Sequence, residues 1–354
     1  MLLKKSLPLL ILLISCATIS AYAQNWVLEW SDEFDSTEID TSKWSFQIGN
    51  GGPELPGWGN NELEYYTDRP ENARIEDSIL IIEARKEFYS GSQYTSARLR
   101  TWGKVDFQFG KIVARMKLPK GQGIWPAFWM LPAKESFTWP TDGEIDIMEL
   151  VGHEPNISYG TIHYGPVWPN NQNKGCPYVL SSGDFNEDFH EFSIEWKTNS
   201  IRWFIDDNFF CQMNPSSLTP HSWPFNSHPF YILLNLAVGG NWPGNPDSTT
   251  EFPQKLEVDY VRFYKDVSTS VQNNLPEESG FSIKVYQDLV AHNFSIESNF
   301  RIEKISIIDI YGKTVREESP QSTKHSVNTE GLPRGIYFLR ATHKGLHEIH
   351  KVVL

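Results

Sequence analysis

The sequence predicts an all-β protein, in which a two-sheet sandwich or jelly roll is followed by a smaller β-sandwich. Short alternating or apolar runs rich in Ile, Val, Phe, Tyr and Trp recur between clusters of Gly, Pro, Asn and Asp. No window keeps the 3.6-residue apolar period of an amphipathic helix. Many strands with little helix, over about 240 residues, are typical of sandwich and jelly-roll domains.

The first 23 residues have the pattern of a secretory signal peptide. Two lysines precede an apolar run over residues 7–13, and Ala21-Tyr22-Ala23 gives the small-x-small pattern of a cleavage site. We therefore expect export and a mature chain that starts at Gln24. A second interpretation takes residues 13–16 as a lipoprotein box, which would anchor the protein through a lipidated Cys16.

Residues 24–265 form the larger expected domain. Its clearest expected strands are 79–84, 110–118, 189–196, 201–205 and 258–264. A polar stretch without periodicity, residues 266–280, is expected to be a linker. The tail, residues 281–354, is expected to be a small Ig-like β-sandwich. Its expected strands are 281–286, 305–311, 335–342 and 348–354.

Composition and cysteine count narrow the function. The 44 Asp and Glu residues exceed the 31 Lys and Arg residues, which gives a formal net charge of −13. So acidic a chain lacks the broad basic surface that nucleic-acid binding needs, and we expect no nucleic-acid partner. If the chain is exported, Cys176 and Cys211 form a disulfide or remain two buried thiols, and the sequence leaves both open.

Segment 143–149 is the strongest candidate for a catalytic motif. On a strand, Glu144 and Asp146 share one face while the isoleucines that follow each of them face a core. Strict alternation would bury Glu149 at high cost. Either the strand ends at Glu149, or a β-bulge near Met148 turns Glu149 onto the Glu144 face. With the bulge, the two glutamate carboxyls could approach the ~5–5.5 Å separation of a retaining glycosidase. The competing interpretation is an acidic strand facing solvent.

The tryptophans fall into two classes. Trp125, Trp129 and Trp242 are flanked by Gly and Pro in expected loops, where flat indole faces suit the C–H faces of sugar rings. Core packing is expected instead for the tryptophans within apolar strands, Trp44, Trp196 and Trp203.

Five separated motifs carry a family resemblance. They are GWGNNE (57–62), GQGIWPAFWMLP (121–132), GEIDIMELVG (143–152), GTIHYG (160–165) and VGGNWPG (238–244). Together they resemble the laminarinase-type members of glycoside hydrolase family 16, over about residues 25–265. The resemblance implies a β-jelly roll with a concave substrate groove and retaining hydrolysis of β-glucans. It also implies that Glu144 is the nucleophile, Glu149 the general acid/base and Asp146 the residue that modulates the nucleophile, with Met148 matching the bulged form of the motif.

The resemblance extends to residues around the catalytic motif. Asn60 and Arg100 match groove positions that contact glucosyl residues on the non-reducing side. Trp102 stands where relatives often carry a polar residue, and would add a stacking platform or simply pack. His163 is a candidate to hydrogen-bond a carboxylate or a sugar; the competing interpretation is a structural strand histidine.

No cofactor is expected for the chemistry. A structural calcium is implied on the convex face, with Glu33 and Asp259 as carboxylate ligands from the two ends of the domain. The competing interpretation is that both are ordinary surface carboxylates.

The tail has a resemblance of its own. IDIYGKTV (308–315), GLPRGIY (331–337) and the closing KVVL (351–354) resemble the C-terminal sorting domain of the type IX secretion system in Bacteroidota. This implies contact with that secretion machinery and a secreted or cell-surface product. The alternative is a small Ig-like or carbohydrate-binding module, which the absence of Trp from the tail disfavours.

Together these features predict a secreted, monomeric endo-β-1,3-glucanase that acts with retention on laminarin-like polysaccharide. One alternative is the same fold acting on mixed-linkage β-1,3-1,4-glucan or on a marine galactan. Another is a non-catalytic β-glucan-binding lectin, which should lack one of the three carboxylates that this chain retains.

Overall fold

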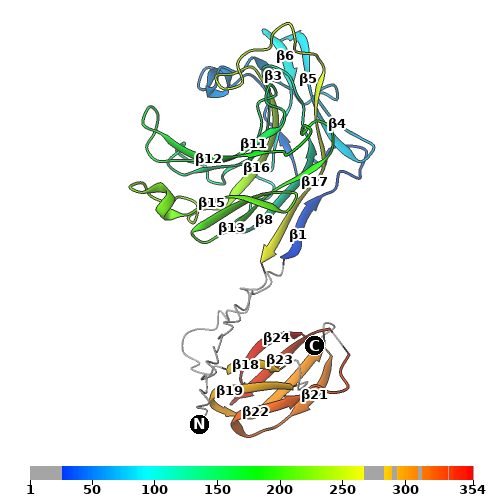
Figure 1. The fold of residues 1–354 in the computed structure, drawn as a ribbon, viewed down its shortest axis with the longest axis vertical. Helices are drawn as coiled ribbons and strands as arrows, with labels where there is room; N and C mark the ends of the chain where they lie inside the picture. Colours follow the sequence, from blue (N-terminus) through cyan, green and yellow to red (C-terminus); the bar gives the residue numbers. More distant parts are fainter. Residues whose placement is uncertain (1–25, 267–282, 289–292, 310–312, 334, 354) are drawn as a thin grey trace, which may run out of the picture. The chain divides into compact units, whose positions relative to one another are not determined.

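The computed structural model describes residues 26–266, 283–288, 293–309, 313–333 and 335–353, which form two compact units (Figure 1). The expected signal peptide, the lipid site at Cys16 and the expected linker beyond Asp266 lie outside the described residues. Helix is confined, within the described ranges, to two short 3-10 segments, η1 (Pro56–Gly59) and η2 (Pro215–Leu218). The all-β prediction is confirmed. No described helix has the length and apolar character needed to cross a membrane.

The larger unit is built from two facing sheets. The ten-stranded sheet has the order β15-β14-β13-β8-β17-β5-β6-β3, with β1 added at β17 and β4 at β5. Its strands are β1 (Trp26–Asp32), β3 (Glu64–Tyr66), β4 (Ala73–Glu76), β5 (Ile79–Tyr89), β6 (Ser92–Ser96), β8 (Gly110–Lys117), β13 (His190–Lys197), β14 (Ser200–Ile205), β15 (Asn208–Met213) and β17 (Gln254–Asp266). All pairings in this sheet are antiparallel except β3 with β6.

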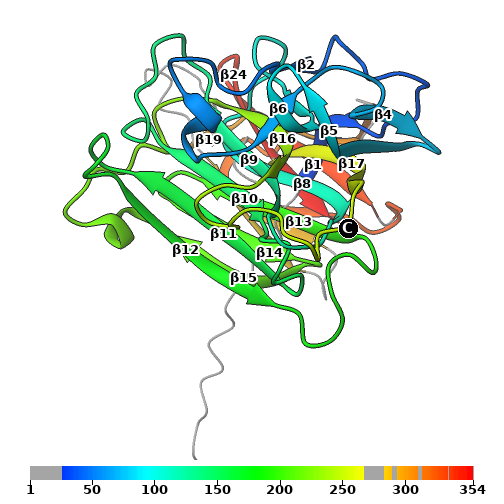
Figure 2. The ribbon, with the colours of Figure 1, turned by 90° about the horizontal axis from the view of Figure 1, so that it is seen from above.

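The seven-stranded sheet is antiparallel and has the order β12-β11-β10-β9-β16-β7-β2. Its strands are β2 (Ser45–Phe46), β7 (Arg98–Arg100), β9 (Ile124–Pro132), β10 (Glu144–Glu149), β11 (Ile157–Tyr164), β12 (Gln172–Val179) and β16 (Phe230–Val238). In Figure 2, β10, β11 and β12 run side by side, next to β13, β14 and β15 of the other sheet. Every residue of β16 is buried, which suits its central position.

One hydrophobic core fills the space between these sheets. The expectation that Trp44, Trp196 and Trp203 pack in the core is confirmed, since each is fully buried. Each buried indole N–H has an acceptor, as burial of a polar group requires. Trp44 donates to Asp32 Oδ2 at 2.8 Å, and Trp196 to the Phe225 carbonyl at 2.9 Å.

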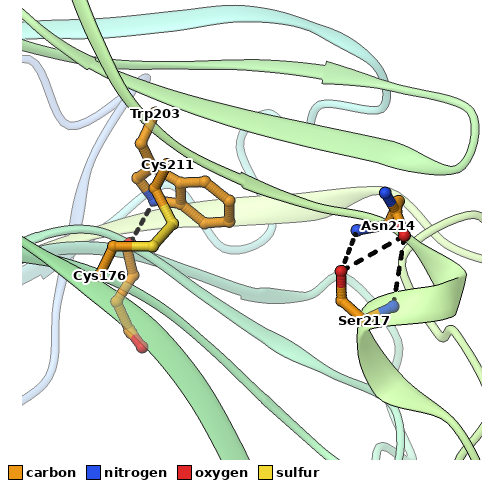
Figure 3. The surroundings of a disulfide bond; sticks show 6 residues. Cys176, Trp203, Cys211, Asn214 and Ser217 are labelled. Atoms are coloured by element: carbon orange, nitrogen blue, oxygen red, sulfur yellow. Dashed lines mark hydrogen bonds between the residues drawn. A yellow bond between two sulfur atoms is a disulfide. The ribbon is translucent and has the colours of Figure 1, made fainter.

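A disulfide joins the two sheets at one edge, which decides the alternative that the sequence left open. Cys176 of β12 and Cys211 of β15 are bonded, with their Cα atoms 5.9 Å apart (Figure 3). Both are edge strands, and each has a hydrogen-bonded neighbour strand on one side only. The disulfide therefore links one edge of each sheet to the other.

The smaller unit is also a β-sandwich. One sheet has the order β18-β19-β22 and the other β21-β20-β23-β24. The strands are β18 (Ile283–Asp288), β19 (Asn293–Ile302), β20 (Lys304–Asp309), β21 (Thr314–Glu318), β22 (Ser322–Asn328), β23 (Ile336–His343) and β24 (Leu346–Val353). A separate core contains apolar side chains from both sheets, including Phe294, Ile307 and Leu339.

Candidate active site

A groove of about 1050 Å³ crosses the exposed face of the seven-stranded sheet. It runs from the segment around η1, over β7, β16, β9, β10 and β11, to β12. The alternation of side chains along β9 shows how a strand places residues in the groove. Trp125, Ala127, Trp129 and Leu131 line the groove, while the residues between them are buried.

A β-bulge in β10 places three acidic side chains in this groove. Asp146 is paired with Thr161 and Glu149 with Tyr159, so three steps along β10 match two along β11. The extra residue allows both Ile147 and Met148 to face the core. Glu144, Asp146 and Glu149 all line the groove. The bulge is the second of the two arrangements that the sequence allowed, and it is confirmed.

Glu144 and Asp146 lie against a histidine on the neighbouring strand. His163 is the register partner of Glu144 on β11. Its Nε2 is 3.6 Å from Glu144 Oε1 and 3.3 Å from Asp146 Oδ2. Burial disfavours the charged ring, but the negative charges of Glu144 and Asp146 outweigh burial and raise the pKa of His163 to about 10. The ring is therefore an imidazolium at neutral pH, and it contacts carboxylates as the sequence suggested.

The two glutamates have different surroundings. Trp139 Nε1 donates to Glu144 Oε2 at 3.0 Å, and Trp125 Nε1 donates to Glu149 Oε1 at 3.1 Å. Burial, and then the charge of Asp146, raise the pKa of Glu144 to about 7. The same two causes, in the same order, raise the pKa of Glu149 well above its usual value. Burial is the larger of the two causes for both carboxyls. Both carboxyls therefore hold a proton to higher pH than a solvent-exposed glutamate does.

The other predicted sugar-binding tryptophans lie in the groove. Trp125 and Trp242 meet edge to face, with ring centroids 5.6 Å apart, and Trp242 is 41% exposed. Trp129 is fixed by donating to Asn235 Oδ1 at 2.7 Å. Asn60 also lines the groove, and its side-chain amide donates to Glu62 Oε1 at 3.0 Å.

Arg98, rather than Arg100, is among the residues that line the groove. The guanidinium of Arg98 lies 4.4 Å from the Trp58 ring centroid and 4.8 Å from that of Trp129. Arg100 pairs with Leu233 in the same sheet, and its contact with a glucosyl residue stays a prediction. Alternation puts both arginine side chains on the same face of β7, so it does not distinguish them. What distinguishes them is their neighbours, because the tryptophans that contact Arg98 come from other segments of the chain. Trp102 packs edge to face on Tyr231, with ring centroids 5.0 Å apart.

The predicted calcium ligands do not fit a metal site in this geometry. Glu33 accepts two hydrogen bonds from Arg262, at 3.0 and 2.7 Å, and Asp259 accepts one from Arg115 at 2.5 Å. Calcium takes six to eight oxygen ligands, whereas each of these carboxylates neutralises a guanidinium. Among described residues, the one group of three metal-ligand side chains with atoms within 4.8 Å is Glu144, Asp146 and His163.

Sequence reasoning did not single out three groove residues that the structure shows, Trp58, Arg98 and Trp139. A signal existed for Trp139, which stands in a Trp-Pro pair just before GEID. No local pattern identified Arg98, since its partners come from distant segments.

Comparison with known proteins agrees with this geometry. The family described as glycosyl hydrolases family 16 matches residues 60–262, and the secretion system C-terminal sorting domain matches residues 285–354. A beta-glucanase from Rhodothermus marinus is 43% identical over 275 residues, which cover 73% of this chain and 93% of that protein.

Solved structures match the same part of the chain. The laminarinase catalytic domain from Thermotoga maritima MSB8 has a TM-score of 0.65 and 50% identity, covering 69% of this chain and 99% of that one. The laminarinase from Rhodothermus marinus has a TM-score of 0.62 and 42% identity, covering 69% and 98%.

Proposed function

Because the chain belongs to glycosyl hydrolases family 16, we propose that it is a secreted endo-β-1,3-glucanase that hydrolyses laminarin-like polysaccharide with retention of configuration. The observation that carries the proposal is the bulge in β10, which puts Glu144 and Glu149 on one face of a strand that crosses the groove. The activities of the relatives, a beta-glucanase and a laminarinase, support β-1,3-glucan as the substrate.

The two glutamates have different roles in the reaction. Glu144 attacks the anomeric carbon as its carboxylate, while Glu149 transfers its proton to the glycosidic oxygen. The bond from the anomeric carbon to the leaving sugar breaks, and a glycosyl ester forms on Glu144. Water then attacks the same carbon and gives a proton to Glu149, which releases Glu144. The raised pKa of Glu149 supports this assignment, because the general acid must hold a proton near neutral pH.

Three side chains affect the pKa values of these glutamates. The Trp139 N–H and the His163 cation both favour the ionised form of Glu144. Asp146 acts in the opposite direction, because its charge raises the pKa values of both glutamates. A contact between Asp146 and His163 at 3.3 Å keeps that charge paired. We expect Asp146 to hold the cationic ring in position beside the nucleophile.

The groove supports endo action. It continues on both sides of β10, towards Asn60 in one direction and towards β12 in the other. A polysaccharide chain can therefore lie across the catalytic carboxylates with sugars on both sides. The match to a secretion sorting domain at residues 285–354 indicates type IX export to the cell surface or the extracellular space. We further propose that the mature enzyme acts as a monomer, which size-exclusion chromatography tests.

Product analysis tests the function. Glu144→Gln and Glu149→Gln should each lower laminarin turnover by several orders of magnitude while the circular dichroism spectrum is unchanged. Sizing the products from laminarin, lichenan and agarose separates a β-1,3-glucanase from a mixed-linkage glucanase and from a galactanase. Binding of laminarin without any hydrolysis by the wild type would support the lectin alternative instead. Near-normal laminarin hydrolysis by either variant would contradict the proposed mechanism.

A further inference from the structure

The β12 side of the groove holds a set of polar and aromatic side chains that the catalytic chemistry does not use. Trp168, Asn171 and Asn173 line the groove beyond β11, on the side of the catalytic carboxylates opposite Asn60. Trp168 lies in the β11–β12 connection and is 76% exposed, far more than Trp242 at 41%. Trp168 is therefore a groove residue whose indole is open to solvent over most of its surface.

Trp168 differs from the other groove tryptophans in its contacts. The indole N–H groups of Trp125, Trp129 and Trp139 are each bonded to a carboxylate or an amide. Among the described residues, Trp168 has no such hydrogen bond and no aromatic neighbour. Its ring is therefore available to a ligand, both at its faces and at its N–H.

The loop that carries Trp168 is held in place by its own hydrogen bonds. The Asn170 N–H donates to the Val167 carbonyl at 3.1 Å, which closes a turn around Trp168. The side-chain amide of Gln172 donates to the carbonyls of Asn170 and Asn171, at 3.0 Å each. These bonds fix the backbone on both sides of the indole, which lowers the entropy lost when a ligand binds.

Strand β12 supplies the rest of this surface. Alternation turns Asn173, Gly175 and Pro177 towards the groove, while Cys176 packs towards the other sheet through its disulfide. A Cβ atom at Gly175 would lie 2.6 Å from Thr161 Oγ1, so glycine lets β12 approach β11 closely here. The side-chain amides of Asn171 and Asn173 take part in no hydrogen bond within the described ranges. Each offers two donors and an acceptor to a ligand.

We propose that Trp168, Asn171 and Asn173 form a subsite for a glucosyl unit on the β12 side of the cleavage point. A flat indole beside two unpaired amides matches the chemistry of a sugar ring, which has an apolar C–H face and a rim of hydroxyls. This inference rests on the proposed function, because the glucosyl unit is part of the chain that Glu144 and Glu149 cleave. It makes Trp168 a residue that selects substrates by length, since only chains that extend to β12 gain the contact.

The test compares Trp168→Ala with Val167→Ala in the full secreted chain. Val167 is a matched control, because it is the neighbouring exposed apolar residue, at 51%, and does not line the groove. We measure kcat and KM on laminarioligosaccharides of increasing length. Trp168→Ala should lower kcat/KM on the long substrates about tenfold, which equals about 1.4 kcal/mol, and leave the shortest substrate unchanged. Trp168→Phe should recover part of the loss, and Val167→Ala should match the wild type throughout.

The outcomes separate this inference from the proposed function. If the wild type cleaves laminarin and Trp168→Ala matches Val167→Ala at every length, the subsite is wrong and the function stands. Loss of activity by equal factors at all lengths, with a lowered melting temperature, would also overturn the subsite, because it indicates a structural role. Both would be overturned if the wild type does not cleave laminarin and the Glu144→Gln variant does not bind it, with binding measured by calorimetry.

Discussion

The indole N–H of Trp203 donates a 2.8 Å hydrogen bond to the main-chain carbonyl of Asp146, across the interior of the larger unit. Trp203 belongs to β14 of the ten-stranded sheet, whereas Asp146 lies where the bulge in β10 begins. A bulge interrupts the ladder of a strand and leaves backbone groups that need other partners. The bond therefore supports the backbone of the catalytic strand from the core side. Figure 3 shows Trp203 beside the Cys176–Cys211 disulfide.

We predict that Trp203→Phe lowers both stability and turnover. Phenylalanine keeps an aromatic ring but leaves the buried Asp146 carbonyl without its donor, which costs about 1–3 kcal/mol. Loosening of the bulge should shift Glu144 and Glu149 relative to one another and lower kcat by about tenfold or more. Denaturant unfolding and laminarin kinetics measure the two effects.

Trp196→Phe is the matched control. Trp196 is also fully buried in the ten-stranded sheet, but its N–H donates to the Phe225 carbonyl and not to a residue of β10. This variant should lose similar stability and keep the wild-type kcat. Equal kcat values for the two variants would show that the bond to Asp146 does not position the catalytic strand.

We predict that Gly160→Ala destabilises the same region from the neighbouring strand β11. A Cβ atom at Gly160 would lie 2.4 Å from Trp203 Cδ1, so the indole must move. Overpacking of this kind costs about 1–3 kcal/mol and should disturb the bond to Asp146. Calorimetry should show a lower melting temperature for the larger unit, together with reduced kcat. Gly335→Ala is the control, because its nearest contact is 3.9 Å away, and wild-type melting of Gly160→Ala would contradict the prediction.

We predict that the acidic limb of the pH–activity profile reflects the ionisation of Glu144. Glu144 must be ionised, and its pKa is raised to about 7, so kcat/KM should rise as the pH increases through about 7. The pKa of His163 is about 10, so the ring remains charged throughout this range.

His163→Gln tests the assignment. Loss of the nearby cation removes an influence that lowers the pKa of Glu144, so the acidic limb should move to higher pH. A limb that stays in place, or moves to lower pH, would show that another group controls it. Stopped assays on laminarin over a pH series measure the limb.

We predict that replacing both cysteines of the disulfide by serine lowers the free energy of unfolding by about 2–4 kcal/mol. The bond closes a loop with a sequence separation of 35, and it ties two edge strands that have a neighbour on one side only. Guanidinium unfolding of the wild type with and without a reductant provides the control, since reduction should reproduce the serine variant. Equal stability of the oxidised wild type and the double variant would contradict the prediction.

The catalytic motif was the part of the site that the sequence predicted best. Alternation alone places Glu144 and Asp146 on one face, and the cost of burying Glu149 leaves only a strand end or a bulge. The structure selects the bulge because Ile147 and Met148 both fit the core. Alternation alone leaves that choice open, whereas the family resemblance, through Met148, already implied the bulged form.

Long-range neighbours decided the rest of the site. Arg98 and Arg100 are equivalent by alternation, and the rings of Trp58 and Trp129 bring Arg98 into the groove. Glu33 and Asp259 were predicted as calcium ligands by resemblance, yet Arg262 and Arg115 lie against them.

The sequence by itself determined the fold class and the sorting tail, and it singled out Glu144, Asp146 and Glu149 as candidate catalytic carboxylates, because these depend on periodicity and on motifs that are contiguous in the chain. Tertiary structure alone decided the pairing of Cys176 with Cys211, the extent to which burial raises the pKa values of the glutamates, and the surface around Trp168. Each of these depends on burial or on contacts between distant strands, which arise only when the sheets pack.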